Sequence, residues 1–521
     1  RYDQAGRMTR LWTPDGAVWR FEYDQMARHS ATVTPEGNRW ELTYDLAGQL
    51  VEVTDPADYT TAASYDAVGR VVQTTNQEGT VTTYTYDDVQ RTTTVTDALG
   101  VVSVEERDAA GRVVARTDGS GVTTTSTYDA DGNVIEITDP AGTVSMEYDL
   151  AGRVTETTDA SGRSTGATYD PLGRLSSIIH PGGATETFTY DPVGNLVSHT
   201  DQTGAVWTYA YDEANQLVTA TDPLDGETTY TYDALGRQTS VTDAAGVTTH
   251  TAYDPVGRPA VRWDASGGSW VTRYDLEGNV VEEVAPDGVT HTHTVDERGL
   301  RTETVWGSLL YRFDYEYDAM GRLVAKDDPY ETSWTYDIRD RVVAVTDAQG
   351  NTTSYEYDGE GRLTKETLPS GRETTWTYDA AGRLASATDG LGNTSHYDYD
   401  PAGRLTSITL PRGGQYTYSY DAVGRLQTET DPLGEVTSYG YDAVGRLTST
   451  TYPSGRTVTA AYDAAGRLTG MTASGLTRAF GYDPAGRLTS ATEGASTLTY
   501  EYDERGLLRR QTDIHGDTTY T

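Results

Sequence analysis

The most constraining feature of the sequence is a short motif, Tyr-Asp-x-x-Gly-Arg-Leu, that returns from one end of the chain to the other. Nearly all copies stand 21 residues apart, with a few steps of 19, 20 or 22. The series comprises 25 units, two of which carry Arg107 and Val295 in place of the tyrosine. A period of this length, sustained over 521 residues, is typical of a repeat architecture and outranks any local secondary-structure assignment.

The segment from the Asp to the Arg of each motif predicts a hairpin turn. Asp at the first turn position accepts backbone N–H groups, and Gly at the fourth tolerates the left-handed backbone conformation. In a type I turn with a glycine bulge, Asp421 lies opposite Arg425 and Tyr420 lies opposite Leu426. Such cross-strand pairs contribute about 0.2 to 1 kcal/mol each, and every unit repeats them. We therefore expect the motif to close one β-hairpin per unit.

The residues between two motifs predict two strands and a second turn. The run after the Arg alternates aliphatic residues with Thr or Ser, a composition favoured in strands. The second turn contains segments such as Asp431–Gly434 and Asp139–Gly142, in which Pro presets the backbone angle of the second position. The next strand is rich in Thr, with Tyr at alternate places, as in Thr82–Tyr86. The chain is therefore expected to form about fifty antiparallel strands in one continuous meander.

The two faces of this meander decide what it can enclose. Alternation places Tyr84 and Tyr86 on one face and Thr83 and Thr85 on the other. With 4 Phe against 38 Tyr, neither face offers the aliphatic surface that a sandwich or a filled barrel needs. Fifty strands would spread over about 240 Å, and accumulated twist prevents so wide a flat sheet. We predict an all-β fold: a repeat array of antiparallel β-hairpins coiled spirally into a hollow shell or barrel with a wet interior.

Composition narrows the possible partners. The formal net charge of -39 argues against a nucleic-acid partner or an anionic membrane surface. No apolar run approaches the length of a membrane span, so we expect no membrane insertion by this segment. Cysteine is absent, and stability therefore owes nothing to disulfides. An acidic array rich in Thr and Gly is compatible with a secreted or cell-surface protein.

No linker or change of composition interrupts the period, so residues 1–521 are interpreted as one continuous array. Both ends fall inside a repeat unit, which suggests a piece of a longer polypeptide. The two weakest stretches are Glu105–Arg107, where the tyrosine is lost, and Val295–Asp318, where the spacing stretches and then shrinks. Within the second stretch, Trp306–Tyr311 is expected to form a longer or bulged connection. We interpret both stretches as structural irregularities.

The recurrent motif and its period resemble the YD-repeat family, also called Rhs repeats. The resemblance covers essentially the whole chain. Family members include bacterial Rhs polymorphic toxins, the cocoon component of insecticidal Tc toxin complexes, wall-associated proteins and animal teneurins. The copies that match best are YDAVGRL at 420–426 and 441–447, YDAAGRL at 378–384 and 462–468, and YDPAGRL at 399–405 and 482–488.

The resemblance implies a β-ribbon wound spirally into a hollow YD/Rhs-type shell. In the toxins such a shell encapsulates a C-terminal effector, and in teneurins it supports adhesion domains. Toxin members also carry a core-associated segment with a DPxGL-x-GG-like signature and aspartates that release the effector. Asp431–Gly434 is superficially similar, but Glu435 follows it and it occupies an ordinary turn position. The array is therefore expected to lack the plug, the core-associated segment and the effector.

Nothing in the sequence predicts an enzyme. Most of the 79 acidic residues stand at turn positions, where capping of the backbone accounts for them. Paired carboxylates for glycoside hydrolysis cannot be distinguished from this background. The sequence contains no Cys nucleophile, no Gly-x-Ser-x-Gly elbow and no phosphate-binding loop. We predict no catalytic residue, no cofactor and no resident metal.

Two short segments are candidate metal sites. His291 and His293 lie two residues apart, on one strand face and near Asp296, and imidazoles bind zinc or nickel. Two ligands are an incomplete set, so a solvated pair is the simpler interpretation. Asp129–Asn133 resembles a calcium loop but lacks the later Glu at the required spacing. A turn is the better interpretation of that segment.

The tryptophans offer a third kind of site, because exposed aromatic faces can stack on sugars. Several of them stand where the second strand normally carries a tyrosine, as Trp376 does in TTWTYD. This placement favours a role as ladder residues within the sheet. The nine positions are Trp12, Trp19, Trp40, Trp207, Trp263, Trp270, Trp306, Trp334 and Trp376.

The leading hypothesis is a non-enzymatic structural shell that encloses and helps deliver a C-terminal toxin or effector domain of the same longer polypeptide. An acidic exterior would keep so large a β-surface soluble. The alternative is an extracellular adhesion or carbohydrate-binding module of a wall-associated protein, with cell-surface glycans or proteins as partners. In that case the Trp and Tyr ladders, including Trp207 and Trp376, would form the binding surface.

Overall fold

The computed structural model describes residues 1–307, 311–327, 330–513 and 516–520. Within these residues the protein is built from fifty β-strands and contains no α-helix, and hence no helix that could span a membrane. Each strand pairs antiparallel with the strands before and after it in the sequence, from β1–β2 to β49–β50. In the described part of the chain the sheet does not close on itself through backbone pairing.

One kind of strand leads into the Tyr-Asp turn, and its members carry even numbers. Their bounds are β2 Val18–Tyr23, β4 Arg39–Tyr44, β6 Thr60–Tyr65, β8 Val81–Asp87, β10 Val102–Arg107, β12 Thr123–Tyr128, β14 Gly142–Tyr148, β16 Ser164–Tyr169, β18 Thr185–Tyr190, β20 Val206–Tyr211, β22 Glu227–Tyr232, β24 Thr248–Tyr253, β26 Ser269–Tyr274, β28 Thr290–Val295, β30 Tyr311–Tyr317, β32 Thr332–Tyr336, β34 Thr352–Tyr357, β36 Glu373–Tyr378, β38 Thr394–Tyr399, β40 Gln415–Tyr420, β42 Val436–Tyr441, β44 Thr457–Tyr462, β46 Leu476–Tyr482, β48 Ser496–Tyr502 and β50 Gly516–Thr519.

The other kind of strand follows that turn, and its members carry odd numbers. Their bounds are β1 Arg10–Trp12, β3 His29–Val33, β5 Leu50–Thr54, β7 Val71–Thr75, β9 Thr92–Thr96, β11 Val113–Thr117, β13 Val134–Asp139, β15 Val154–Thr158, β17 Leu175–Ile179, β19 Leu196–Thr200, β21 Leu217–Thr221, β23 Gln238–Thr242, β25 Pro259–Asp264, β27 Val280–Val284, β29 Arg301–Trp306, β31 Leu323–Asp327, β33 Val342–Thr346, β35 Leu363–Thr367, β37 Leu384–Thr388, β39 Leu405–Thr409, β41 Leu426–Thr430, β43 Leu447–Thr451, β45 Leu468–Ala473, β47 Leu488–Glu493 and β49 Leu508–Asp513.

The Asp-x-x-Gly-Arg segment forms the predicted turn, here called the motif turn. Gly424 N–H donates to Asp421 O at 2.9 Å, and Asp421 N–H donates to Arg425 O at 2.9 Å. Gly424 has a φ of 93°, the left-handed conformation that glycine adopts without a Cβ clash. Tyr420 lies opposite Leu426, with a bulge just before it. The predicted turn and its register are confirmed. The turn at the other end of each hairpin is called the linker turn.

The two faces of each strand differ in the predicted way. In β40 the side chains of Gln415, Thr417 and Ser419 are exposed, whereas Tyr416, Tyr418 and Tyr420 are half-buried. The tyrosine face therefore carries most of the side-chain packing of the sheet.

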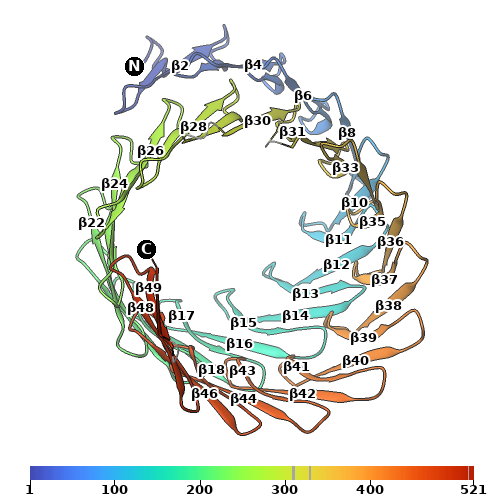
Figure 1. Ribbon diagram of the computed structural model, residues 1–521. Helices are drawn as coiled ribbons and strands as arrows, with labels where there is room; N and C mark the ends of the chain where they lie inside the picture. The colour runs from blue at the N-terminus through green and yellow to red at the C-terminus, as the bar shows by residue number, and fades with distance from the viewer. Residues whose placement is uncertain (308–310, 328–329, 514–515, 521) are drawn as a thin grey trace.

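The meander winds around a central axis for about two turns (Figure 1). Strands β2 to β8 run alongside β26 to β33, and interactions across this boundary join residues that are 239 to 260 positions apart. We refer to residues 1–253 as the first wind and to residues 254–520 as the second wind. No segment of the described chain runs along the central axis (Figure 1).

The part of the interior that the described residues form contains no dry core. Among the described residues the buried hydrophobic side chains are Ala17, Ala31, Val33 and Ala205. The accessible surface is 29251 Å², whereas a compact monomer of 56.6 kDa would expose about 18,600 Å². The excess reflects a single-layered wall with solvent on both sides. The predicted fold, an all-β spiral of hairpins around a wet interior, is confirmed.

The irregular stretch near Val295 keeps the meander. Trp306 pairs with Tyr311 across the hairpin formed by β29 and β30. The tip of the expected longer connection, residues 308–310, lies outside the described residues.

Candidate functional site

The motif turn is locked by its own aspartate. Asp421 Oδ1 accepts the backbone N–H groups of Val423 and Arg425 at 3.1 and 2.8 Å. Its second oxygen, Oδ2, accepts Arg425 Nε–H at 2.7 Å. Burial alone would raise the pKa of Asp421, but the N–H groups and the guanidinium of Arg425 hold that pKa below its usual value. The carboxylate therefore stays charged and keeps the turn closed.

The arginine of each motif also reaches the next hairpin. The Arg425 guanidinium lies over the ring of Tyr441, 4.9 Å from its centroid, and Arg425 Nη1–H donates to Asp442 O at 2.6 Å. The same stacking recurs along the chain, from Arg7 over Tyr23 to Arg487 over Tyr502. A cation–π contact of this kind contributes about 0.5 to 1 kcal/mol at an exposed site.

The tyrosine completes the link between hairpins. Tyr441 O–H donates to Leu426 O at 2.9 Å, and Tyr420 O–H donates to Leu405 O at 2.6 Å. The acceptor is the residue that follows the arginine of the preceding motif. Tyr, Asp, Arg and Leu are thus all engaged in one relay that joins each hairpin to the next. The motif recurs because every hairpin needs this connection.

The boundary between the two winds forms a seam. Motif turns of the second wind lie against linker turns of the first wind. Three arginines of those motif turns form ion pairs across it: Arg258 with Asp15 at 3.1 Å, Arg322 with Glu78 at 2.5 Å, and Arg339 with Asp97. Two further contacts are the Asn38–Glu277 hydrogen bond at 3.1 Å and the stacking of Arg298 over Tyr59 at 5.4 Å.

Apolar side chains at the tips of the motif turns also contribute to the seam. Where nothing covers such a tip, the side chain is exposed: Leu46 and Leu150 of the first wind are 97% and 110% exposed. Val423 belongs to the second wind and is half-buried, because it lies against a linker turn of the first wind. A Cβ on Gly182 of that linker turn would lie 2.9 Å from Val423 Cγ1, so a glycine is needed for this approach. The seam therefore combines ion pairs with close apolar contact.

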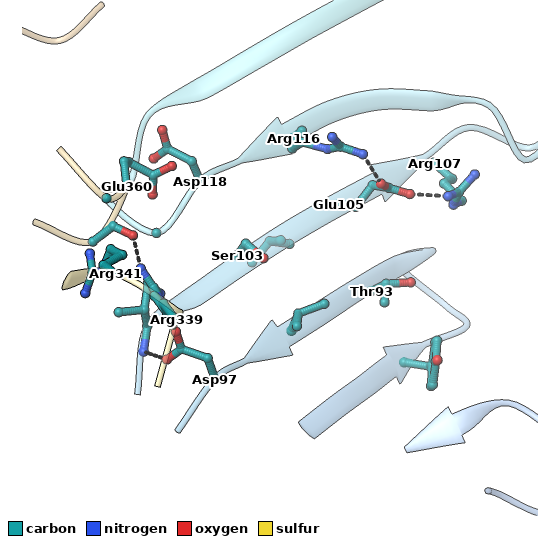
Figure 2. Close-up of a pocket in the computed structure, with 17 residues that line it drawn as sticks. Thr93, Asp97, Ser103, Glu105, Arg107, Arg116, Asp118, Arg339, Arg341 and Glu360 are labelled. Carbon is teal, nitrogen blue, oxygen red and sulfur yellow. Dashed lines mark hydrogen bonds and ion pairs between the residues drawn. The ribbon is translucent and has the colours of Figure 1, made fainter. Parts of the chain in front are cut away.

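A cavity of about 880 Å³ lies where the motif fails at Arg107. Figure 2 shows Arg107 and Arg116 both reaching Glu105 at one end. At the other end Arg339 reaches Asp97 across the seam. The irregularity predicted at Glu105–Arg107 is thus accompanied by a cavity, while β10 stays paired with β9 and β11.

Two family models match the chain. A teneurin YD-shell model matches residues 1–62, 294–398 and 317–484. An RHS repeat model matches residues 65–102, 107–144, 148–185, 190–226, 213–248 and 253–290. Together the two models cover most of the array, and both describe YD or RHS repeats.

The chain belongs to the YD-repeat, or Rhs-repeat, family.

Solved structures agree with this YD-repeat assignment at the level of the fold. Crystal structures of TcdB2-TccC3, with and without the hypervariable C-terminal region, match with TM-scores of 0.68 and 0.72 at 16% and 15% identity, covering 100% and 98% of this chain. The Tc holotoxin pore of Photorhabdus luminescens matches with a TM-score of 0.61 at 15% identity over 98% of the chain. The YD-repeat chain spans 38% of the length of each of these proteins. No curated protein matches its sequence.

In the YD-repeat structure the two candidate metal-ligating histidines, both on β28, contact different partners. His293 is buried, its Nδ1 is 3.0 Å from Thr304 Oγ1, and its Nε2 is 3.1 Å from Glu283 Oε2. Burial lowers the pKa of His293, against the opposing effect of Glu283. His291 instead packs edge-on against Trp306 at 5.2 Å. Among the described residues, no group of three His, Cys, Asp or Glu side chains is arranged to hold a metal ion.

The calcium-like segment is a motif turn. Asp129 Oδ1 accepts the N–H groups of Asp131 and Asn133 at 3.0 and 2.8 Å, and Oδ2 accepts Asn133 Nδ2–H at 2.8 Å. The carboxylate is therefore used in the way the turn interpretation predicts.

Trp207 and Trp376 lie in cross-strand pairs. Trp207 stacks on His199 with centroids 5.3 Å apart, and His199 stacks in turn on Phe188 at 4.9 Å. Trp376 pairs with Ala387 across the hairpin of β36 and β37. The ladder interpretation accounts for Trp207 and Trp376 without a ligand.

Sequence reasoning missed a polar cluster around Glu186, which lies on the same sheet face as His199 and Trp207. Glu186 Oε1 is 3.0 Å from His180 Nε2 and accepts Gln202 Nε2–H at 3.1 Å, while His199 Nε2 lies 3.5 Å from Oε2. Burial would raise the pKa of Glu186, but Gln202 and the two histidines keep it below its usual value. The four residues come from different strands and turns, so no sequence spacing marks them.

Proposed function

We propose that this chain forms part of the wall of a shell that encloses an effector or toxin polypeptide and catalyses no reaction itself. One observation carries the proposal: two winds of the sheet are held edge to edge by the seam, around an axis that no described segment occupies (Figure 1). A wall of this kind separates a polypeptide inside from the solution outside.

The chemistry of the wall supports this role. The motif carboxylates are engaged in turns and ion pairs, as Asp421 is with Arg425, and so are not arranged as catalytic pairs. A net charge of -39 keeps a large two-sided β-surface soluble. We infer that residues 1–521 act as one continuous array and that the protein works outside the producing cell. The proposed partner is a C-terminal effector of the same longer polypeptide.

The test uses the complete gene product in which this array occurs. Limited proteolysis, followed by mass spectrometry, should leave polypeptide beyond residue 521 intact while the wall is closed. The double variant Arg258→Glu and Arg322→Glu places like charges across the seam and should expose that polypeptide to cleavage. The double variant Arg112→Glu and Arg237→Glu breaks two motif-turn ion pairs without touching a seam ion pair and is the matched control. Equal cleavage in the native protein and in the seam variant would contradict enclosure.

The alternative, an adhesion or carbohydrate-binding module, is favoured by a different observation. Trp12, Trp40, Trp270 and Trp306 expose 38% to 50% of their surfaces. Reproducible binding on a glycan array, abolished by Trp270→Ala and retained by Trp207→Ala, would favour this function over enclosure.

A further inference from the structure

The cavity at Arg107 lies where this unit lacks the tyrosine ring that the neighbouring units carry. In the flanking units the ring position is filled in the same way. Tyr86 O–H donates to Val71 O at 2.8 Å, with Arg70 over its ring at 4.3 Å. Tyr128 O–H donates to Val113 O at 2.6 Å, with Arg112 over its ring at 4.7 Å. A tyrosine at position 107 would occupy the corresponding place between these two units.

Arg107 does not fill that place. Its side chain turns back toward its own hairpin, where Nη1–H donates to Gly111 O at 2.8 Å and Nη2 pairs with Glu105. The preceding turn departs from the motif as well. It reads Asp-Asp-Val-Gln-Arg, and Arg91 occupies the left-handed conformation with a φ of 57°. In the flanking units Arg70 stacks over Tyr86 and Arg112 over Tyr128. Within the described residues, Arg91 makes no such contact with residue 107.

The lining of the cavity has the composition of a tyrosine site. Thr93, Val95 and Ser103 provide aliphatic and hydroxyl surface between strands β9 and β10. Tyr86 borders the same space. Figure 2 shows the ion pair of Arg116 with Glu105 at one end, and the Arg116 side chain remains 68% exposed. An aromatic ring can pack on the apolar strip while a guanidinium at the rim lies over its face, as in the other units.

The volume fits more than one ring. At about 880 Å³ the cavity is within the range of ligand sites and exceeds the space that a single phenol occupies. It extends along the strands to the seam, where Asp118, Arg339 and Glu360 line its far end. Polar and charged groups at both ends suit the backbone and flanking side chains of an extended peptide.

We propose that this cavity binds a tyrosine side chain presented by an extended segment of a partner polypeptide. The bound ring takes the place that the repeat tyrosine takes in neighbouring units, and the segment runs along the strands toward the seam. The site is independent of the proposed enclosure, because it requires only the wall itself.

The first probe is N-acetyl-L-tyrosinamide, and the second is an acetylated and amidated pentapeptide with the sequence of residues 83–87, Thr-Tyr-Thr-Tyr-Asp. Saturation-transfer NMR on the full chain should show transfer to the tyrosine ring protons. Arg107→Tyr restores the motif, fills the cavity from within and should weaken binding of both probes at least tenfold. Ser103→Trp fills the same cavity from its floor and should have the same effect.

Arg273→Tyr adds a tyrosine at an exposed site away from the cavity and should leave binding unchanged. Circular dichroism establishes that each variant is folded. The absence of transfer with the native chain would overturn the assignment, and so would equal transfer in the Arg107→Tyr and Ser103→Trp variants. N-acetyl-L-phenylalaninamide should bind more weakly, and equal binding would overturn the choice of tyrosine.

Discussion

The relay between hairpins gives a prediction that isolates one hydroxyl group. Tyr420→Phe removes the O–H that donates to Leu405 O at 2.6 Å and leaves the ring under the Arg404 guanidinium, 4.6 Å from its centroid. A hydrogen bond of this kind contributes about 0.5 to 1.5 kcal/mol, and the loss is larger when the carbonyl is left without a partner. We expect β39, β40 and β41 to lose about 1 kcal/mol of local stability.

The matched control is Tyr418→Phe, because Tyr418 stands two residues earlier on the same face of β40. In the described part of the chain its hydroxyl has no hydrogen-bond partner, and the chemical change is identical. A repeat array can open locally, so a single unfolding temperature would average the effect away. The assay is amide hydrogen exchange, followed by mass spectrometry of peptides that cover residues 405–430.

A loss of about 1 kcal/mol corresponds to exchange about five times faster in the affected hairpins. Peptides several units away should be unchanged, because interactions between repeats reach only their neighbours. If Tyr418→Phe accelerated exchange as much as Tyr420→Phe, the hydroxyl relay would not be the link between hairpins.

Three further predictions concern other parts of the wall. Ala27 occupies the glycine position of its turn with a φ of 67°, so Ala27→Gly should raise the local stability of β2 and β3 by about 1 kcal/mol, measured by amide hydrogen exchange, whereas Ala47→Gly should not stabilise β4 and β5. Arg322→Met should cost about 2 kcal/mol and accelerate exchange in residues 76–80 across the seam, and Arg112→Met should leave that segment unchanged. Asp421 and Asp170 have pKa values below their usual 3.8, so their contribution to stability is complete above that pH and is lost as the pH falls further; circular dichroism should show unfolding only below about pH 4.

The local design was predictable from the sequence, and the links between hairpins were not. Asp421 and Arg425 are four residues apart, and turn geometry alone places them together. The bond from Tyr420 to Leu405 O joins residues that are 15 positions apart in neighbouring hairpins. That contact depends on how far each side chain reaches across the pleat, which residue spacing does not specify.

The same limit applies to the irregular units. The loss of tyrosine at Arg107 marked a weak unit in the sequence, but its cavity depends on the direction in which Arg107 turns and on the turn that precedes it. His293 of β28 meets Glu283 from β27 on one side and Thr304 from β29 on the other. From residue spacing within β28, only the position of His293 relative to His291 could be predicted.

The sequence by itself determined the hairpin, its register, the continuous meander and the absence of an apolar core, because each follows from alternation, turn chemistry and composition within one 21-residue unit. Only the tertiary structure decided the length of a wind and hence the partners at the seam, such as Asp15 for Arg258. The twist between adjacent strands varies from about 10° to 35°. Small differences in twist accumulate over the strands of a wind, so residues some 240 positions apart meet only when the whole sheet has coiled.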